Sequence, residues 1–166
     1  GSLRTEISKA GVAGPVEGTL AVGAGLLRAG PGAAPIALRA LSAGLTYTPE
    51  AQRLRLEQIA LESPALSLGG SAQIYLRDLA QSGAPQTLLV QLALDWLELR
   101  EAGLVAAPVR FEGGALDARI RLDPFTATIG QAALFEGETA LRGAGEVAAR
   151  PGGWQVALDG HADTLS

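Results

Sequence analysis

Apolar and polar residues alternate with a period of two in several segments of this chain. The clearest is 116–123, where Leu, Ala, Ile and Leu alternate with Asp, Arg, Arg and Asp. Similar rows occupy 66–76 and 88–96, with shorter ones at 41–47 and 154–158. Because successive side chains of a β-strand point to opposite faces of a sheet, this period predicts strands with one apolar and one water-facing side.

Two of the apolar rows change phase. Leu54 and Leu56 share a parity whereas Ile59 takes the opposite one, and the row that reaches Trp96 changes face near that residue. One extra residue turns every later side chain to the other face, so we expect β-bulges near Gln58 and near Trp96. Turns rich in Pro, Gly and Asp recur about every 10–14 residues, which indicates consecutive antiparallel strands, about ten in all. We therefore predict an all-β fold, a curved and elongated antiparallel sheet.

One stretch, 23–35, is rich in Gly, Ala and Pro, and we interpret it as a loop or a short helical turn around Leu26, Leu27 and Arg28. The first two residues, Gly1 and Ser2, resemble the remnant of an expression tag, so residues 3–166 are interpreted as one β-rich module cut from a longer protein. Residues 56–74 also match 129–147 at an offset of 73 without a gap, which suggests an internal repeat.

Composition excludes several classes of chemistry. The 166 residues contain no cysteine and one histidine, which rules out disulfides, thiol chemistry, Cys-based zinc sites and multi-His metal sites. The net charge is −4 with acids and bases interspersed, which argues against a nucleic-acid partner. The apolar runs are shorter than the ~20 residues of a membrane-spanning helix. We expect no catalytic residue, no metal and no cofactor.

The residues that suggest chemistry also have ordinary structural interpretations. Residues 143–148 fit a loose dinucleotide fingerprint, but a strand follows them where phosphate binding needs a helix N-terminus. His161 has no evident partner and is interpreted as an exposed histidine; Asp117 and Asp123 are interpreted as parts of a solvated face. Trp96 and Trp154 lie in apolar rows and predict core packing. An enzyme, the least favoured alternative, would need His161 or a specific carboxylate.

The apolar rows themselves are the candidate site. Large aromatic residues are scarce, since Phe, Trp and Tyr make up 4% of the chain, and Ala and Gly occupy many inward positions. The residues alone leave two alternatives open, a closed β-sandwich core of a structural or interaction domain and a groove that takes up acyl chains. The groove candidates are Leu66, Leu68, Ile74, Leu76, Val90, Leu92, Leu94, Leu116, Ile120 and Leu122.

Two stretches carry a resemblance to a known family. The first runs through Thr48-Pro49-Glu50 and Glu62-Ser63-Pro64 to Gly69-Gly70, and the second runs from Asp123-Pro124-Phe125 to Gly152-Gly153-Trp154. Over about 38–160, the chain resembles the repetitive strand modules of the AsmA-like proteins of Gram-negative bacteria, including the YhdP and TamB types.

The resemblance implies a fold, a location and a role. The sheet would be U-shaped in section, a half-barrel with an apolar inner groove, and would lie in the periplasm as part of a protein anchored in the inner membrane by an N-terminal helix missing here. Its implied role is non-enzymatic passage of phospholipid between the inner and outer membranes in outer-membrane biogenesis. The implied partners are phospholipid acyl chains, neighbouring modules of the parent chain and the membrane that holds its anchor.

Overall fold

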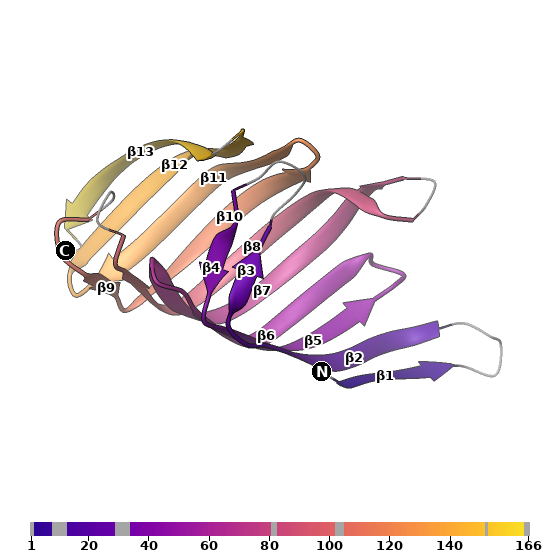
Figure 1. Cartoon of the computed structure of the whole chain (residues 1–166). Helices are drawn as coiled ribbons and strands as arrows, with labels where there is room; N and C mark the ends of the chain where they lie inside the picture. The colour runs from indigo at the N-terminus through magenta and orange to yellow at the C-terminus, as the bar shows by residue number, and fades with distance from the viewer. Residues whose placement is uncertain are drawn as a thin grey trace.

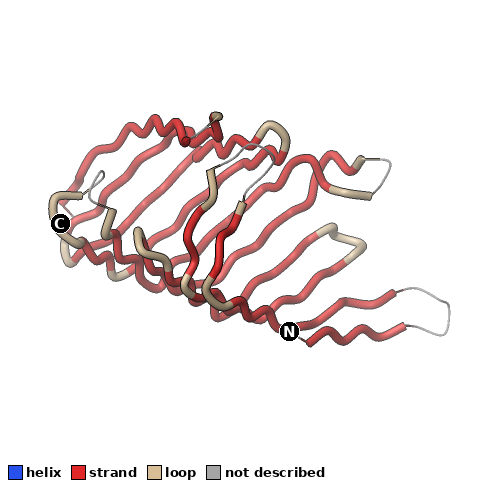
Figure 2. The backbone as a smooth tube through the Cα atoms, in the orientation of Figure 1, coloured by secondary structure: helices blue, strands red, loops and turns tan. Residues whose placement is uncertain are grey.

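The computed structural model describes residues 2–7, 13–28, 34–80, 83–101, 105–151 and 153–164, with side chains from residue 14 onward. All its regular elements are strands (Figure 2). They are β1 (Ser2–Ile7), β2 (Ala13–Val22), β3 (Gly25–Leu27), β4 (Ile36–Leu38), β5 (Ala40–Thr48), β6 (Arg53–Glu62), β7 (Leu66–Leu79), β8 (Pro85–Leu99), β9 (Val109–Phe111), β10 (Gly113–Leu122), β11 (Phe125–Glu136), β12 (Thr139–Arg150) and β13 (Gly153–Thr164).

Eleven of these strands form a single antiparallel sheet (Figure 1). The order is β1-β2-β5-β6-β7-β8-β10-β11-β12-β13, and the short β9 pairs with the end of β8. Neighbours in sequence are therefore neighbours in the sheet, apart from the insertion of β3 and β4 and the branch at β9. This confirms the prediction of an all-β antiparallel sheet of about ten strands; the U-shaped section stays a prediction.

In the segment 23–35, the expected helical turn around Leu26 and Leu27 is wrong, because these residues belong to β3, which pairs with β4 as a separate two-stranded ribbon. The described residues on either side of β3 in this segment carry no regular structure, as a loop would, and residues 29–33 lie outside the described residues. Leu27 lies opposite Ile36 and Gly25 opposite Leu38. Hydrogen bonding to β4, about ten residues further along the chain, decides the conformation of β3. A strand of only three residues is too short to show the alternation from which a strand is predicted.

Both predicted bulges are present. Gln58 has a φ of 51°, and the pairing of β6 with β7 shifts between Leu56 and Ile59. On β8, Trp96 lies opposite Gly69 and Leu94 lies opposite Gly70, so Asp95 is the extra residue. Each bulge returns the apolar side chains that follow it to the face occupied by those before it, which is why the phase changes in the sequence.

The hairpins β6–β7 and β11–β12 have the same pairing at an offset of 73 residues. Leu61 pairs with Leu68, as Leu134 does with Leu141, and the register shift between Leu56 and Ile59 recurs between Ile129 and Ala132. The two segments that match in sequence therefore also match in register. A bulge in β11 was not expected from its sequence, yet it falls at the position that corresponds to the bulge in β6.

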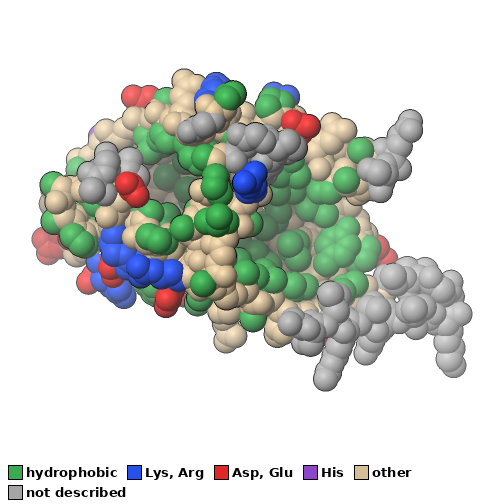
Figure 3. All heavy atoms as spheres, viewed as in Figure 1, with side chains coloured by type: hydrophobic (Ala, Val, Ile, Leu, Met, Phe, Trp, Pro, Cys, Tyr) green, Lys and Arg blue, Asp and Glu red, His purple; other side chains and the backbone are tan. Residues whose placement is uncertain are grey.

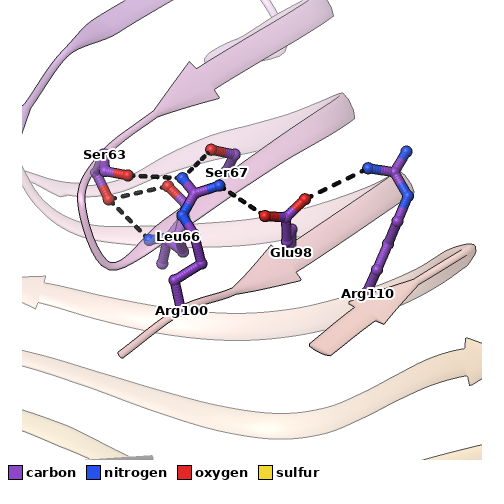
Figure 4. A network of polar contacts seen from close by, with 6 residues as sticks. All are labelled: Ser63, Leu66, Ser67, Glu98, Arg100 and Arg110. Atoms are coloured by element: carbon purple, nitrogen blue, oxygen red, sulfur yellow. Dashed lines mark hydrogen bonds and ion pairs between the residues drawn. The ribbon is translucent and has the colours of Figure 1, made fainter. Parts of the chain in front are cut away.

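A polar network fixes the end of β8 to the turn between β6 and β7 (Figure 4). The guanidinium of Arg100 donates to the Ser63 carbonyl at 2.8 Å, to the Ser67 hydroxyl and to the Glu98 carboxylate at 2.8 Å. Glu98 also lies 3.6 Å from the guanidinium of Arg110, which is on β9. The network thus connects three strands at the point where β8 leaves β10 and pairs with β9.

Candidate functional site: an apolar face of the sheet

The strand register decides which side chains share a face, because residues directly opposite each other in an antiparallel pair point to the same side. Leu92 in β8 lies opposite Ala72 of β7 and opposite Leu116 of β10. Val90, two residues earlier, lies opposite Ile74 on the same neighbouring strand. The apolar rows of β7, β8 and β10 are therefore adjacent on one side of the sheet.

All ten groove candidates lie on this same side. Leu66 and Leu68 face Leu99 and Leu97 across the β7–β8 pair, and Ile74 and Leu76 face Val90 and Leu88. Leu94 lies between two glycines, and Ile120 lies opposite Leu88. Leu122 follows Ile120 by two residues and pairs with Phe125 of β11. Leu94 is buried and the other nine are half-buried.

The same face continues over strands whose orientation the sequence left open. On β5 and β6 it includes aliphatic side chains on both sides of the bulge at Gln58, and on β11 to β13 it runs past the bulge near Gly130. Following the register through these bulges adds Leu41, Leu45, Leu54, Leu56, Ile59, Leu61, Ile129, Leu134, Leu141, Val147, Trp154, Val156 and Leu158. We call these residues, together with the ten candidates, the apolar face.

The opposite side of the sheet is polar. A row of directly paired residues crosses five strands there: Arg55, Gln73, Gln91, Asp117 and Gln131. All five are exposed. We call the side that carries this row the polar face. The separation of apolar and polar residues between the two faces matches the alternation in the sequence.

The apolar face is hollowed and is not sealed (Figure 3). Among the described residues, no large side chain is fully buried, and the buried cores are two small clusters, one around Ile59 and one around Leu94, Leu97 and Phe111. A cavity of about 250 Å³ opens on this face, lined by Leu116, Ile129, Leu134, Leu141 and Leu158 among others. The described strands place no second large sheet against this face.

Aromatic side chains divide between the two faces. Trp154 lies on the apolar face, where its ring meets that of Phe125 edge-on with centroids 5.6 Å apart. The parity of Trp96 predicts that it lies in the apolar row of β8, and this prediction is wrong. The bulge at Asp95 turns the Trp96 side chain to the polar face. There its ring covers Gly69, and the ring centroid lies 4.9 Å from Cζ of the Arg110 guanidinium.

The residues with possible catalytic or ligand roles are not assembled into a site. Residues 143–148 lie within β12, which continues as a strand to Arg150, so no helix N-terminus follows the glycines. His161 is exposed on the polar face of β13, and its Nε2 lies 3.4 Å from the Asp163 carboxylate. No group of three or more potential metal ligands gathers in the described part of the chain.

Comparisons with known proteins identify no relative of this chain. No protein family, no curated protein and no solved structure matches this chain. Among the described residues there is also no helix with the length and hydrophobicity needed to cross a membrane. The geometry of the apolar face is therefore the basis for a functional proposal.

Proposed function

We propose that this protein is a non-enzymatic lipid-binding module whose apolar face holds phospholipid acyl chains. The observation that carries the proposal is the apolar face itself, which runs without interruption from β5 to β13. Among the described strands, no second large sheet covers it. Soluble monomers rarely expose continuous apolar patches larger than a few hundred Å², and larger ones mark sites where an apolar partner binds.

The chemistry of the face fits an alkyl chain. Its residues are almost all aliphatic, and the charged rows lie on the polar face. Removing a methylene group from water is favourable by about 0.8 kcal/mol, so a long acyl chain gains several kcal/mol on such a surface. The headgroup stays at the open side in water and needs no charged pocket. Such a site has low headgroup selectivity.

The proposed biological setting follows from the resemblance to AsmA-like proteins. In that setting the sheet belongs to a longer periplasmic protein anchored in the inner membrane, and neighbouring modules of the parent chain extend the apolar face. Phospholipid then passes along the face between the inner and outer membranes, in support of outer-membrane biogenesis. The main alternative is a structural or interaction domain whose apolar face forms a closed core.

The first test is the lipid content of the purified protein. We expect organic extraction and native mass spectrometry to find bound phospholipid. The proposal fails if protein purified from a bacterial host carries none and takes up none from phosphatidylethanolamine and phosphatidylglycerol vesicles.

The second test places a charge on the apolar face. Ile74→Asp, Leu92→Asp and Ile120→Asp alter half-buried side chains, so the new carboxylate keeps contact with water and the fold survives while lipid binding falls. In a closed core the same changes would unfold the domain, because an unpaired buried charge costs several kcal/mol.

Matched controls lie on the polar face of the same strands. Gln73→Asp is adjacent to Ile74 and Ala93→Asp to Leu92, and both alter exposed side chains that have no acidic residue directly opposite. We expect these controls to keep both the melting temperature and the bound lipid. Loss of lipid from the controls, or unfolding of all three apolar-face variants, would contradict the proposal.

A further inference from the structure

The ribbon of β3 and β4 stands apart from the large sheet. It is inserted between β2 and β5, and among the described strands its two members pair only with each other. In Figure 1 the ribbon rises in front of the sheet, and in Figure 3 it crosses the hollow of the apolar face. The backbone N–H of Arg39 donates to the Glu62 carbonyl at 2.8 Å, which attaches the base of the ribbon to the end of β6.

The two sides of the ribbon differ in orientation. Leu27 pairs with Ile36 and Gly25 with Leu38, so these side chains share one side, whereas Leu26 lies on the other. Leu38, at the base, is only 7% exposed, so its side of the ribbon turns toward the body of the protein. Leu27 and Ile36 point the same way.

The side chains of Leu27 and Ile36 nevertheless lack full packing. They are 50% and 41% exposed, although they belong to the side that turns inward. The ribbon therefore does not pack tightly against the large sheet. Leu27 and Ile36 leave aliphatic surface free on the side of the ribbon that turns toward the hollow, and such surface suits an aliphatic occupant.

We propose that this ribbon is a clasp that covers an acyl chain lying on the apolar face, with Leu27 and Ile36 in contact with the chain. The inference rests on the proposed lipid-binding function and adds a second wall to that site. An acyl chain on an open apolar surface keeps its outer side in water, and the two ribbon side chains remove that side from water. A lipid held under the ribbon leaves more slowly than one held by the sheet alone.

Photo-crosslinking tests the clasp directly. A benzophenone amino acid replaces Leu27, Ile36, Leu26 or Leu92, one at a time, and each protein is incubated with radiolabelled phosphatidylethanolamine and phosphatidylglycerol vesicles. We expect lipid adducts from Leu27, Ile36 and Leu92, and few from Leu26, which lies on the same ribbon but faces away. Adducts at Leu92 without adducts at Leu27 and Ile36, or equal adducts at Leu26 and Leu27, would overturn the clasp and leave the lipid site standing. No adduct at Leu92 would overturn the proposed function itself.

The rate of lipid release is a second measurement. The double variant Leu27→Ser with Ile36→Ser removes the inward aliphatic surface of the ribbon without touching the large sheet. We expect it to release bound lipid to acceptor vesicles roughly tenfold faster, which corresponds to about 1.4 kcal/mol. Leu26→Ser, the control, keeps the original rate. A double variant that folds and releases lipid at the original rate contradicts the clasp.

Discussion

At the scale of single residues, close contact between strands determines where glycine is required. A Cβ atom at Gly70 would lie 2.2 Å from the Ala93 carbonyl oxygen, well inside any normal contact. Gly70 lies beside the bulge at Asp95, where the backbone of β8 bends against β7. At Gly44 in β5, by contrast, the nearest atom to an added Cβ is the Glu57 carbonyl oxygen at 3.7 Å, an ordinary contact.

These two glycines predict opposite effects of the same substitution. Gly70→Ala forces the backbones of β7 and β8 apart, and we expect the free energy of unfolding to fall by about 1–3 kcal/mol. Gly44→Ala adds a methyl group without a clash and lowers the conformational entropy of the unfolded chain. We therefore expect the free energy of unfolding to stay the same or to rise by up to about 1 kcal/mol. Urea unfolding of both variants measures the difference, and equal stabilities would show that the close contact at Gly70 relaxes at no cost.

The residue scale also shows where local pattern misleads. The parity of Trp96 places it with Leu92 and Leu94, but the bulge one residue before it moves its side chain to the polar face. The phase change in the sequence revealed that a bulge exists near this residue. It did not reveal on which side of Trp96 the extra residue lies, because that depends on the partner strand.

At the scale of elements, Arg100 connects the end of β8 to the turn before β7. Its guanidinium satisfies the buried Ser63 carbonyl and Ser67 hydroxyl together with Glu98, which is half-buried. Removing one partner of such a network leaves the others unsatisfied, and each buried polar group without a partner costs about 1–3 kcal/mol. The network therefore contributes to the geometry at which β8 passes from β10 to β9.

We expect Arg100→Ala to lower the free energy of unfolding by about 1–3 kcal/mol. Arg119→Ala, which removes an exposed arginine from the polar face of β10, is expected to change it by less than about 0.5 kcal/mol. Chemical denaturation followed by circular dichroism compares the two. If the free energy of unfolding falls by the same small amount in both variants, the network contributes no more to stability than an exposed charge does.

The hairpins show how much of an element can be predicted from local sequence. The bulges at Gln58 and near Trp96 follow from a change of phase that the sequence displays. The bulge near Gly130 is marked by a weaker phase change, in which the odd-numbered Ala127 and Ile129 are followed by the even-numbered Ala132 and Leu134 among small and polar residues. The register that β11 shares with β6 at an offset of 73 places it clearly.

At the scale of the whole molecule, one edge of the sheet is β13, for which the described part of the chain provides no second partner strand. Among the described strands, β13 pairs only with β12, and most of its side chains are exposed. Two of them, Val156 and Leu158, belong to the apolar face and are 48% and 57% exposed. A long edge with exposed apolar side chains is a template for pairing with another chain.

We expect the isolated protein to associate as its concentration rises, through the edge at β13. Leu158→Lys places a charge on this edge and is expected to shift the protein toward monomer in analytical ultracentrifugation. Leu79→Lys is the control, because Leu79 is similarly exposed but lies at the far end of β7. Association that persists in the Leu158 variant would indicate contact through another surface.

The sequence by itself determined which residues of each regular strand share a side, where the main turns fall and that two bulges are needed. These properties depend on the two-residue repeat of an extended backbone, which acts over a few neighbouring residues. The pairing of one strand with another depends on hydrogen bonds between separate segments of the chain, which no local pattern encodes. Only the tertiary structure therefore decided that β3 pairs with β4 over the hollow, that Trp96 faces the polar side, and that the separate apolar rows join into one continuous face.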